Sequence, residues 1–152
     1  MHKRSGYVPL SKVTIFFLLS AGLYIFPWFY KNRKYLMEKL KSPDHSLIDT
    51  LLLAIPVVNL VMLYDQQSLT KDLLKEKKKE PDVQPPAVVG LTIVLGIIAT
   101  ISTALIIFAF IIPFIMQRDL NKTTANKEYW IITVGEFIMI AIGLFAWISI
   151  LS

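Results

Sequence analysis

Glu136 is the residue in this sequence that most suggests chemistry. It is the single charged residue between Tyr129 and Ser152, in a run that is otherwise apolar. A carboxylate in such a run is costly unless it is paired, hydrated or protonated, and intramembrane acids therefore often bind protons or cations. Tyr24 and Asn59 lie at comparable depths in other apolar runs and are its candidate partners. Three interpretations stay open: a proton or cation site, a polar contact to a partner subunit, or a structural hydrogen bond within a helical bundle.

The rest of the sequence offers no recognisable catalytic or metal-binding motif. It has no cysteine, which excludes disulfides, zinc–thiolate sites, iron–sulfur clusters and thiol catalysis. Its two histidines, His2 and His45, lack a second histidine at the spacing of metal ligands. No serine has the context of a nucleophile elbow, and no glycine run resembles a phosphate-binding loop. We therefore expect no enzymatic activity, no metal and no cofactor.

Glu136, Tyr24 and Asn59 lie in long apolar runs, which must position them. Apolar residues make up 55% of the 152 residues, and the charges are gathered in blocks between the runs. A hydrocarbon core about 30 Å thick is crossed by roughly 20 helical residues. We therefore predict an all-α fold: a single integral membrane domain over residues 1–152, built as a bundle of four transmembrane helices. The predicted spans are about 13–30, 47–64, 87–116 and 129–151.

The second of these spans is short. Its uncharged part, Thr50 to Tyr64, has 15 residues and makes about 22 Å of helix, and Pro56 interrupts it. We interpret it as a tilted short span or as a re-entrant one. The chain then continues through residues 65–86, which are predicted as a charged helical extension followed by a stiff proline-containing linker.

Small side chains recur every four residues along the third span. In lipid, such a stripe lets two helices approach closely. Two glycines of the fourth span lie near one helix face and are expected to meet this stripe. We interpret the set as a helix packing seam rather than a ligand groove. Its members are Thr92, Gly96, Thr100, Ala104, Gly135 and Gly143.

The first span ends in aromatic residues that are followed by basic ones. Trp28 and Tyr30 close the apolar run, and Lys31, Arg33 and Lys34 come next. Indole and phenol rings favour the membrane–water interface, because their bodies are apolar and their polar edges need water. Long basic side chains extend from there to the headgroups. The pattern predicts an interfacial anchor, with a specific lipid headgroup site as the alternative.

A sequence pattern similar to this exit recurs later in the chain. PWFYKNRKYL from Pro27 and PFIMQRDLNK from Pro113 share a proline, an aromatic residue, two large apolar residues and then polar ones. The segment MLYDQQSLTKDL, which starts at Met62, is a looser version. Two interpretations stay open: a degenerate internal repeat, or the common pattern of a helix that leaves a membrane.

At these residues the chain resembles a family of small, uncharacterised prokaryotic membrane proteins, classified as domain of unknown function four-two-three-four. The resemblance is carried by an apolar run ending in Gly-aliphatic-Tyr, by a Trp-aromatic-Tyr-basic exit, and by a later Gln-x-x-Leu-Asn. It covers the first three spans, and the family supplies no activity to transfer. The matching residues are Gly22, Leu23, Tyr24, Trp28, Phe29, Tyr30, Lys31, Gln117, Leu120 and Asn121.

The loop charges do not decide the orientation of the four spans. With both termini on one side, eight Lys and Arg residues fall on each side of the membrane, so the positive-inside rule gives a tie. Some members of the family that the chain resembles carry a soluble zinc-ribbon extension before the first span. The resemblance therefore implies cytoplasmic termini and a multi-pass protein of the cell membrane.

These features together predict a non-enzymatic accessory or assembly subunit of a larger membrane complex. Its expected partners are membrane lipids and either other membrane subunits or further copies of itself. The alternative is a small proton- or cation-linked transporter or channel-like oligomer that uses Glu136. A nucleic-acid partner is not expected despite the net charge of +5, because basic residues beside membrane spans are ordinary and no nucleic-acid-binding motif is present.

Overall fold

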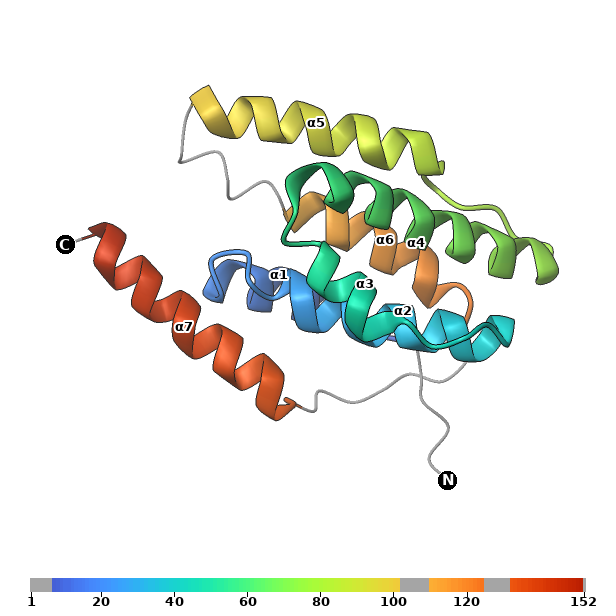
Figure 1. Cartoon of the computed structure of the whole chain (residues 1–152), viewed down its shortest axis with the longest axis horizontal. Helices are drawn as coiled ribbons and strands as arrows, with labels where there is room; N and C mark the ends of the chain where they lie inside the picture. Colours follow the sequence, from blue (N-terminus) through green and yellow to red (C-terminus); the bar gives the residue numbers. More distant parts are fainter. Residues whose placement is uncertain (1–6, 102–109, 125–131, 152) are drawn as a thin grey trace.

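The structure of this chain, a computed structural model, describes residues 7–101, 110–124 and 132–151. Within these ranges it consists of α-helices without a strand (Figure 1), which confirms the all-α prediction. The helices described number seven, not the four that the apolar runs predicted. They are α1 (Leu10–Leu19), α2 (Ile25–Leu40), α3 (Ser46–Leu52), α4 (Pro56–Glu76), α5 (Pro85–Ile101), α6 (Ile111–Asn121) and α7 (Val134–Leu151).

The first predicted span, 13–30, is two helices because the chain turns within it. Ala21 and Gly22 both have positive φ angles, 49° and 88°, which a right-handed helix does not accommodate. Glycine takes such an angle without steric cost, which explains why one stands there. The second helix of the segment, α2, therefore begins only at Ile25 and runs in a new direction (Figure 1).

The second and third predicted spans are divided as well. Pro56 stands in the first turn of α4, where its missing N–H is not needed for an intrahelical hydrogen bond. Residues 53–55 form the turn before it. Farther along, α5 and α6 run in opposite directions (Figure 1), so residues 87–116 are not one helix. The first two apolar runs thus form helical hairpins in place of continuous spans. The described parts of the third form two helices that run in opposite directions, and we call this pair a hairpin as well.

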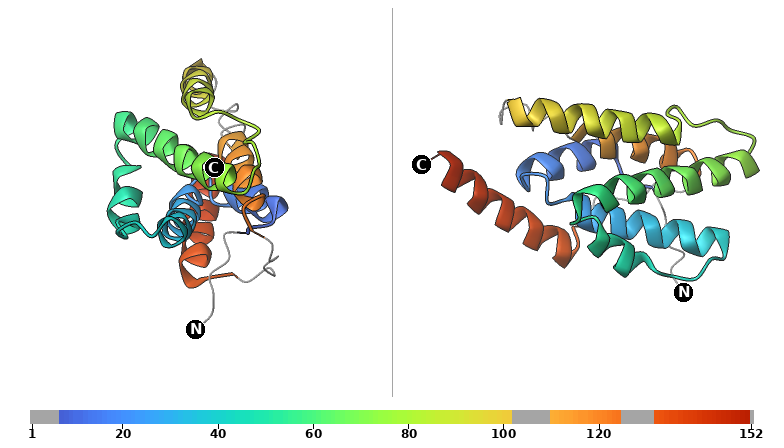
Figure 2. Two further views of the ribbon diagram at one scale, coloured as in Figure 1. Left: turned by 90° about the vertical axis from the view of Figure 1, so that its right-hand side faces the viewer. Right: turned by 45° about the horizontal axis from the view of Figure 1, so that its top comes forward.

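The fold consists of three hairpins, α1–α2, α3–α4 and α5–α6, followed by α7. In Figures 1 and 2, α2, α4 and α6 run in one direction, and the helix before each runs the opposite way. Hydrogen bonds fix the register of α2 and α6: Asn32 contacts Gln117, and Tyr35, farther along, contacts Thr123. We call the end where the hairpins turn the tip end, and the end where α2, α4 and α6 finish the base end.

The three segments that share the sequence pattern of the first helix exit occupy equivalent places in these hairpins. The segments that begin at Pro27, Met62 and Pro113 lie on α2, α4 and α6, the returning helix of each hairpin. Each buries polar residues at a similar distance from its start, among them Asn32 and Gln117. This arrangement favours an internal repeat over a pattern shared only by helix exits.

α7 runs parallel to α1. Glu136, near its start, contacts Lys12 near the start of α1, and Gly143 lies against Ser20, which directly follows α1. The helix therefore points toward the tip end, as α1, α3 and α5 do. Figure 1 shows it beside the turn of the first hairpin and outside the other two hairpins.

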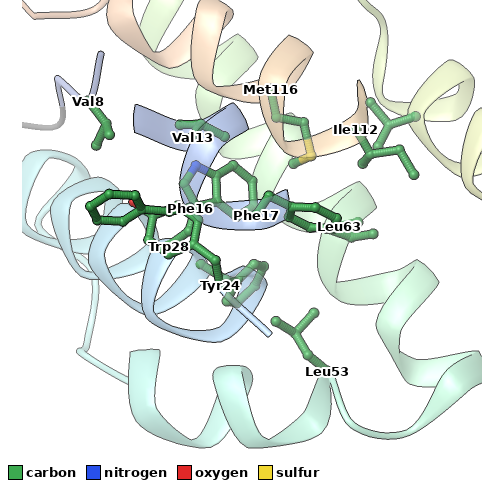
Figure 3. Packing of buried hydrophobic residues seen from close by; sticks show 12 residues of the cluster. Val8, Val13, Phe16, Phe17, Tyr24, Trp28, Leu53, Leu63, Ile112 and Met116 are labelled. Carbon is green, nitrogen blue, oxygen red and sulfur yellow. The ribbon is translucent and has the colours of Figure 1, made fainter. Parts of the chain in front are cut away.

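Two hydrophobic clusters hold the hairpins together. The larger lies toward the tip end, where side chains of the first hairpin meet α4 and α6 (Figure 3). Its large, fully buried members are Val13, Tyr24, Trp28, Phe29, Leu63 and Met116. The smaller cluster lies toward the base end and consists of Tyr35, Leu36, Leu73 and Leu120. Polar side chains on α2, α4 and α6 lie between the two clusters.

Large apolar side chains cover much of the outer surface of α3, α5 and α7. Leu51 of α3 is 66% exposed, Ile97 of α5 57% and Phe145 of α7 72%. In soluble monomeric proteins, large contiguous patches of this kind mark binding surfaces. Over the described ranges, no helix has both the length and the apolar character that crossing a membrane requires.

Candidate functional site

A layer of polar side chains crosses the bundle between the two hydrophobic clusters. Its centre is Gln117 on α6, which is fully buried. The Oε1 atom of Gln117 accepts hydrogen bonds from Trp28 Nε1 at 2.8 Å and from Asn32 Nδ2 at 2.9 Å. Its Nε2 atom donates to Asn121 Oδ1 at 2.8 Å. Both ends of the amide are used, which offsets the cost of removing it from water and joins α2 to α6.

Asn121 extends the polar layer to the segment before α1. Its Oδ1 atom accepts a hydrogen bond from Val8 N at 3.1 Å, and its Nδ2 atom donates to Val8 O at 2.8 Å. A backbone amide and carbonyl with no helical partner are thereby satisfied. The contact places the start of α1 at the end of α6, so the first and third hairpins are joined at the base end.

Arg33 joins three helices through one guanidinium group. It is 5% exposed. Its Nε atom lies 2.6 Å from Asp49 Oδ2 on α3, and its Nη2 atom lies 2.5 Å from Asp65 Oδ2 on α4. A guanidinium can contact two carboxylates at once because its donors point in several directions. The two acids offset the cost of burying the positive charge and tie the second hairpin to α2.

Asp119 holds the linker between α4 and α5 against α6. Its fully buried carboxylate accepts hydrogen bonds from Gln67 Nε2 at 2.8 Å and from the backbone N atoms of Asp82 and Val83 at 2.7 Å and 3.3 Å. Asp82 in turn lies 2.6 Å from Lys122 Nζ. The hydrogen bond from Lys122 keeps the pKa of Asp82 below its ordinary value, although partial burial opposes that shift.

Glu136 lies in a second buried polar cluster, between α7 and the first hairpin. It is 3% exposed. Its carboxylate lies 2.9 Å from Lys12 Nζ and accepts a hydrogen bond from the Tyr24 hydroxyl at 3.2 Å. It also accepts one from Thr133 N at 2.8 Å, while Thr133 Oγ1 accepts one from Glu136 N at 3.3 Å. The reciprocal contact with Thr133 is a capping box, which satisfies free amides at the start of α7.

Lys12 is a member of this cluster that the sequence did not identify. It precedes the first apolar run and has the pattern of an ordinary flanking charge. In the structure it is 3% exposed, and its Nζ atom also lies 5.2 Å from the centre of the Phe16 ring. Its pairing with Glu136 depends on α7 running parallel to α1. The sequence signal available for this cluster was the Thr133-x-x-Glu136 spacing, which is typical of a capped helix start. It marks the start of α7 and not the pairing with Lys12.

Of the two candidate partners of Glu136, the structure brings Tyr24 to it and not Asn59. Tyr24 reaches Glu136 from the start of the second helix in the first hairpin, where its ring also packs edge-on against Phe16. Asn59 lies in the second hairpin and donates a hydrogen bond from Nδ2 to Leu53 O at 3.2 Å. The expectation that Asn59 contacts Glu136 is therefore wrong, and its amide serves the turn between α3 and α4.

The predicted interfacial anchor is only partly available at the surface. Trp28 is 1% exposed and Arg33 is 5% exposed, and both are held in the polar layer. The anchor interpretation is wrong for these two residues, because a side chain must reach the headgroups to anchor a protein. Tyr30, Lys31 and Lys34 are half-buried at the surface. An aromatic and basic pattern looks the same in sequence whether the helix enters water or a polar protein interior.

Gly143 is the member of the predicted packing seam at which the structure shows a close backbone contact. A Cβ atom on Gly143 would lie 2.2 Å from backbone atoms of Ser20. Four residues later, Trp147 Nε1 donates a hydrogen bond to Leu18 O at 2.8 Å. Glu136, Gly143 and Trp147 follow one helix face, so α7 contacts the first hairpin along its length.

The other members of the seam have different surroundings. A Cβ atom at Gly96 or at Gly135 would meet nothing within 4 Å. Thr92 donates a hydrogen bond to a carbonyl within its own helix. The side chain of Thr100, and Ala104 altogether, lie outside the described residues. The close contact at Gly143 is thus with the first hairpin, whereas the sequence placed it at the third apolar run.

The described polar clusters hold helices together and do not form a metal site. In the part of the chain that the structure describes, no three acidic or histidine side chains are grouped so that they could hold a metal ion. A surface pocket of about 260 Å³ lies beside Tyr30, Asp44 and His45. There, hydrogen bonds from the Ser46 side chain and backbone lower the pKa of Asp44.

In the described residues, the fold and its polar layer define an all-α protein of three helical hairpins, with α7 from the fourth apolar run docked on the first hairpin. Comparisons of the chain with protein-family models, with curated proteins and with solved structures found no match. The family resemblance carried by Gly22, Trp28 and Gln117 therefore stays a prediction.

Proposed function

We propose that this chain is a non-enzymatic membrane protein that serves as an accessory or assembly subunit of a larger membrane complex. The observation that carries the proposal is that several polar groups are buried beside the hydrophobic clusters while many large apolar side chains are exposed. Polar and charged groups lie buried between α2, α4 and α6, whereas large apolar groups are exposed on α3, α5 and α7. In water, exposed apolar area costs about 25 cal/mol per Å². Contact with lipid or with another apolar protein surface removes that cost.

α7 has the clearest division into two faces. Glu136 and Gly143 are buried against the first hairpin, whereas Phe137, Phe145 and Ile148 are each at least 66% exposed. The exposed face carries no charge from residue 137 to residue 151. Such a face fits acyl chains or the apolar helix of a partner subunit.

Gln117 and Glu136 support an accessory role because their hydrogen bonds serve the fold itself. Gln117 is shared between Trp28 and Asn32, and Glu136 is held by Lys12, Tyr24 and a backbone amide. A catalytic group instead needs an open coordination position or a hydrogen-bonding atom directed at a substrate. The surface available for contacts is apolar, and recognition of other membrane components is the function that this surface supports.

Co-purification tests the proposal directly. The tagged chain is extracted from membranes of its host in a mild detergent, and co-eluting proteins are identified and quantified by mass spectrometry. We expect recovery from the membrane fraction together with a stoichiometric partner. A monodisperse protein without a stoichiometric partner would overturn the accessory role.

Two matched variants identify the contact surface. Phe145→Ser on α7 and Ile97→Ser on α5 each place a hydroxyl on an exposed apolar face. Loss of the partner in one variant and its retention in the other would assign the interface to one helix. Retention in both would place the partner on a surface other than these two faces.

A second candidate function is proton- or cation-linked transport through Glu136. The buried Lys12–Glu136 pair is the observation that favours it, because ion pairs at membrane depth occur in proton pathways. The same contacts argue for a structural role, since a cation would have to displace Lys12. Reconstitution in liposomes separates the two: transport predicts a proton- or cation-dependent flux that Glu136→Gln abolishes in a folded protein. Absence of flux in the parent protein would exclude it.

A further inference from the structure

We propose that the three hairpins and α7 enter a lipid bilayer from one side, tip end first, so that the charged segments described here all stay on that side. This topology rests on the proposed function, since it requires a membrane protein. It replaces four alternating crossings with re-entrant insertion of the apolar runs. The exposed apolar surface at the tip end is then occupied by the acyl chains of a phospholipid bilayer.

The direction of the helices is the first observation that carries this topology. α1, α3, α5 and α7 run toward the tip end, and α2, α4 and α6 return to the base end (Figures 1 and 2). The ends of α2, α4 and α6 therefore lie at one end of the molecule. In an arrangement of four crossing spans, the connection after α2 and the connection after α4 would lie on opposite sides.

The charges follow the same axis. Residues 13–30 and 50–64 contain the two described hairpin turns and no charged residue, and residues 83–117 of the third hairpin are also uncharged. Most described charged side chains lie instead toward the base end, on the base halves of α2 and α4 and at the end of α6. The exceptions nearer the tip end are Lys12 and Glu136, which are buried against each other as an ion pair. An uncharged tip suits hydrocarbon, and a base with an excess of lysine suits anionic headgroups.

α1 has the length of one leaflet, whereas α5 and α7, with 17 and 18 residues, are longer. α1 has 10 residues, and a helix of that length measures about 15 Å. Half of a hydrocarbon core is also about 15 Å thick. Ile15 and Leu19 of α1 are 43% and 39% exposed, and Leu51 of α3 is 66% exposed. Inserted to this depth, these side chains contact acyl chains while the polar layer stays near the headgroups.

The first hairpin turn keeps its backbone hydrogen-bonded, as insertion into hydrocarbon requires. Ser20 Oγ accepts a hydrogen bond from Tyr24 N at 2.8 Å, and Ser20 is fully buried. Leu18 O, at the end of α1, accepts one from Trp147 Nε1 at 2.8 Å. α7 therefore covers the turn and supplies a donor to one of its carbonyls.

Backbone groups of the second hairpin turn are hydrogen-bonded by residues of the same hairpin. Asn59 Nδ2 donates a hydrogen bond to Leu53 O, the carbonyl directly after α3, at 3.2 Å. The amide N atoms of Ala54 and Ile55 donate to carbonyls of α3 at 3.1 Å each. This hydrogen bond gives the polar Asn in the uncharged run a role, because a turn that enters lipid needs its carbonyl groups hydrogen-bonded.

Cysteine labelling tests the topology, and the chain suits it because it contains no cysteine of its own. Single cysteines replace Ser42 after α2, Glu80 after α4, Thr124 after α6 and Ala54 in the second hairpin turn. A membrane-impermeant maleimide is applied to sealed vesicles of either orientation. We expect Ser42→Cys, Glu80→Cys and Thr124→Cys to be labelled from the same side. Ala54→Cys should lose labelling from both sides and regain it in detergent.

Each other outcome is decisive. Labelling of Glu80→Cys and Ser42→Cys from opposite sides would overturn one-sided insertion and support crossing spans. Labelling of Ala54→Cys from the side opposite to Ser42→Cys would show that the second hairpin crosses. A protein recovered from the soluble fraction would overturn the proposed membrane function itself. Labelling as expected in a protein that lacks a stoichiometric partner would remove only the accessory role.

Discussion

The Nζ atom of Lys12 lies 2.9 Å from the carboxylate of Glu136, and both side chains are buried although 124 residues separate them. The pair joins the start of α1 to the start of α7, and the Tyr24 hydroxyl contacts the same carboxylate at 3.2 Å. This contact determines where α7 lies on the first hairpin. It also gives the acid in the fourth apolar run a countercharge.

The buried pair leads to the first prediction. Glu136→Gln should lower the free energy of unfolding by about 3–5 kcal/mol, because it leaves the Lys12 ammonium buried without a countercharge. The double variant Lys12→Met with Glu136→Gln should recover most of that loss, since no charge is then buried. Denaturant unfolding of the detergent-solubilised protein measures both. Equal stabilities of Glu136→Gln and the parent would contradict a buried pair.

The second prediction concerns the contact between α7 and the first hairpin. Gly143→Ala should displace α7, because its Cβ atom would lie 2.2 Å from backbone atoms of Ser20. Overpacking of this kind costs about 1–3 kcal/mol. Gly135→Ala is the matched control, because its Cβ atom would meet nothing within 4 Å. The control should gain up to about 1 kcal/mol from helix propensity. Thermal unfolding of both variants checks this, and shifts in the same direction would refute the close contact.

A third prediction follows from the shared acceptor in the polar layer. Gln117→Leu leaves the buried Trp28 Nε1 and Asn32 Nδ2 donors without their acceptor. Each stranded donor should cost about 1–3 kcal/mol. Trp28→Phe is the comparison, because Gln117 keeps its contact with Asn32 there. The free energies of unfolding of the two variants are measured side by side. A loss in Gln117→Leu no larger than that in Trp28→Phe would show that the amide is not shared.

The fourth prediction concerns acid sensitivity at the linker. The hydrogen bond from Lys122 holds the pKa of Asp82 below its ordinary value. The pKa in the folded protein therefore lies below the unfolded value of about 3.9, so this contact stabilises the fold fully above about pH 4. That stabilisation is lost as the pH falls through the folded pKa. Asp82→Asn should lose less stability on acidification than the parent, as thermal unfolding at a series of acidic pH values measures. Parallel pH curves for the two proteins would contradict it.

The helices themselves were largely predictable, but their number was not. Uncharged runs with helical spacing predicted the all-α class, and Pro56 marked the break before α4. The turn at Ala21 and Gly22 was not predicted, because an isolated glycine in an apolar run is compatible with a continuous helix. Its positive φ turns the chain so that α1 packs against α6 and α7, a tertiary effect that overrides local preference.

The contacts at the candidate sites were also only partly predictable from the sequence. The meeting of Glu136 and Tyr24 was suggested by their depths in two apolar runs, and the structure shows it. Lys12 was missed because its partner lies on a helix whose direction the sequence does not specify. The roles of Trp28 and Gln117 were missed because a Trp at the end of an apolar run has the same pattern at a membrane interface as in a protein core.

The sequence was enough to predict that this chain forms apolar helices with charges gathered in separate blocks, because residue composition and the helical period are local properties. It also determined that the few polar residues inside those runs need partners, since an unpaired buried polar group is costly. Which partners these polar residues have depends on how the helices pack in three dimensions. The direction of each hairpin sets which residues reach the same level, and that direction depends on contacts such as Lys12 with Glu136 and Asn32 with Gln117, which join distant parts of the chain.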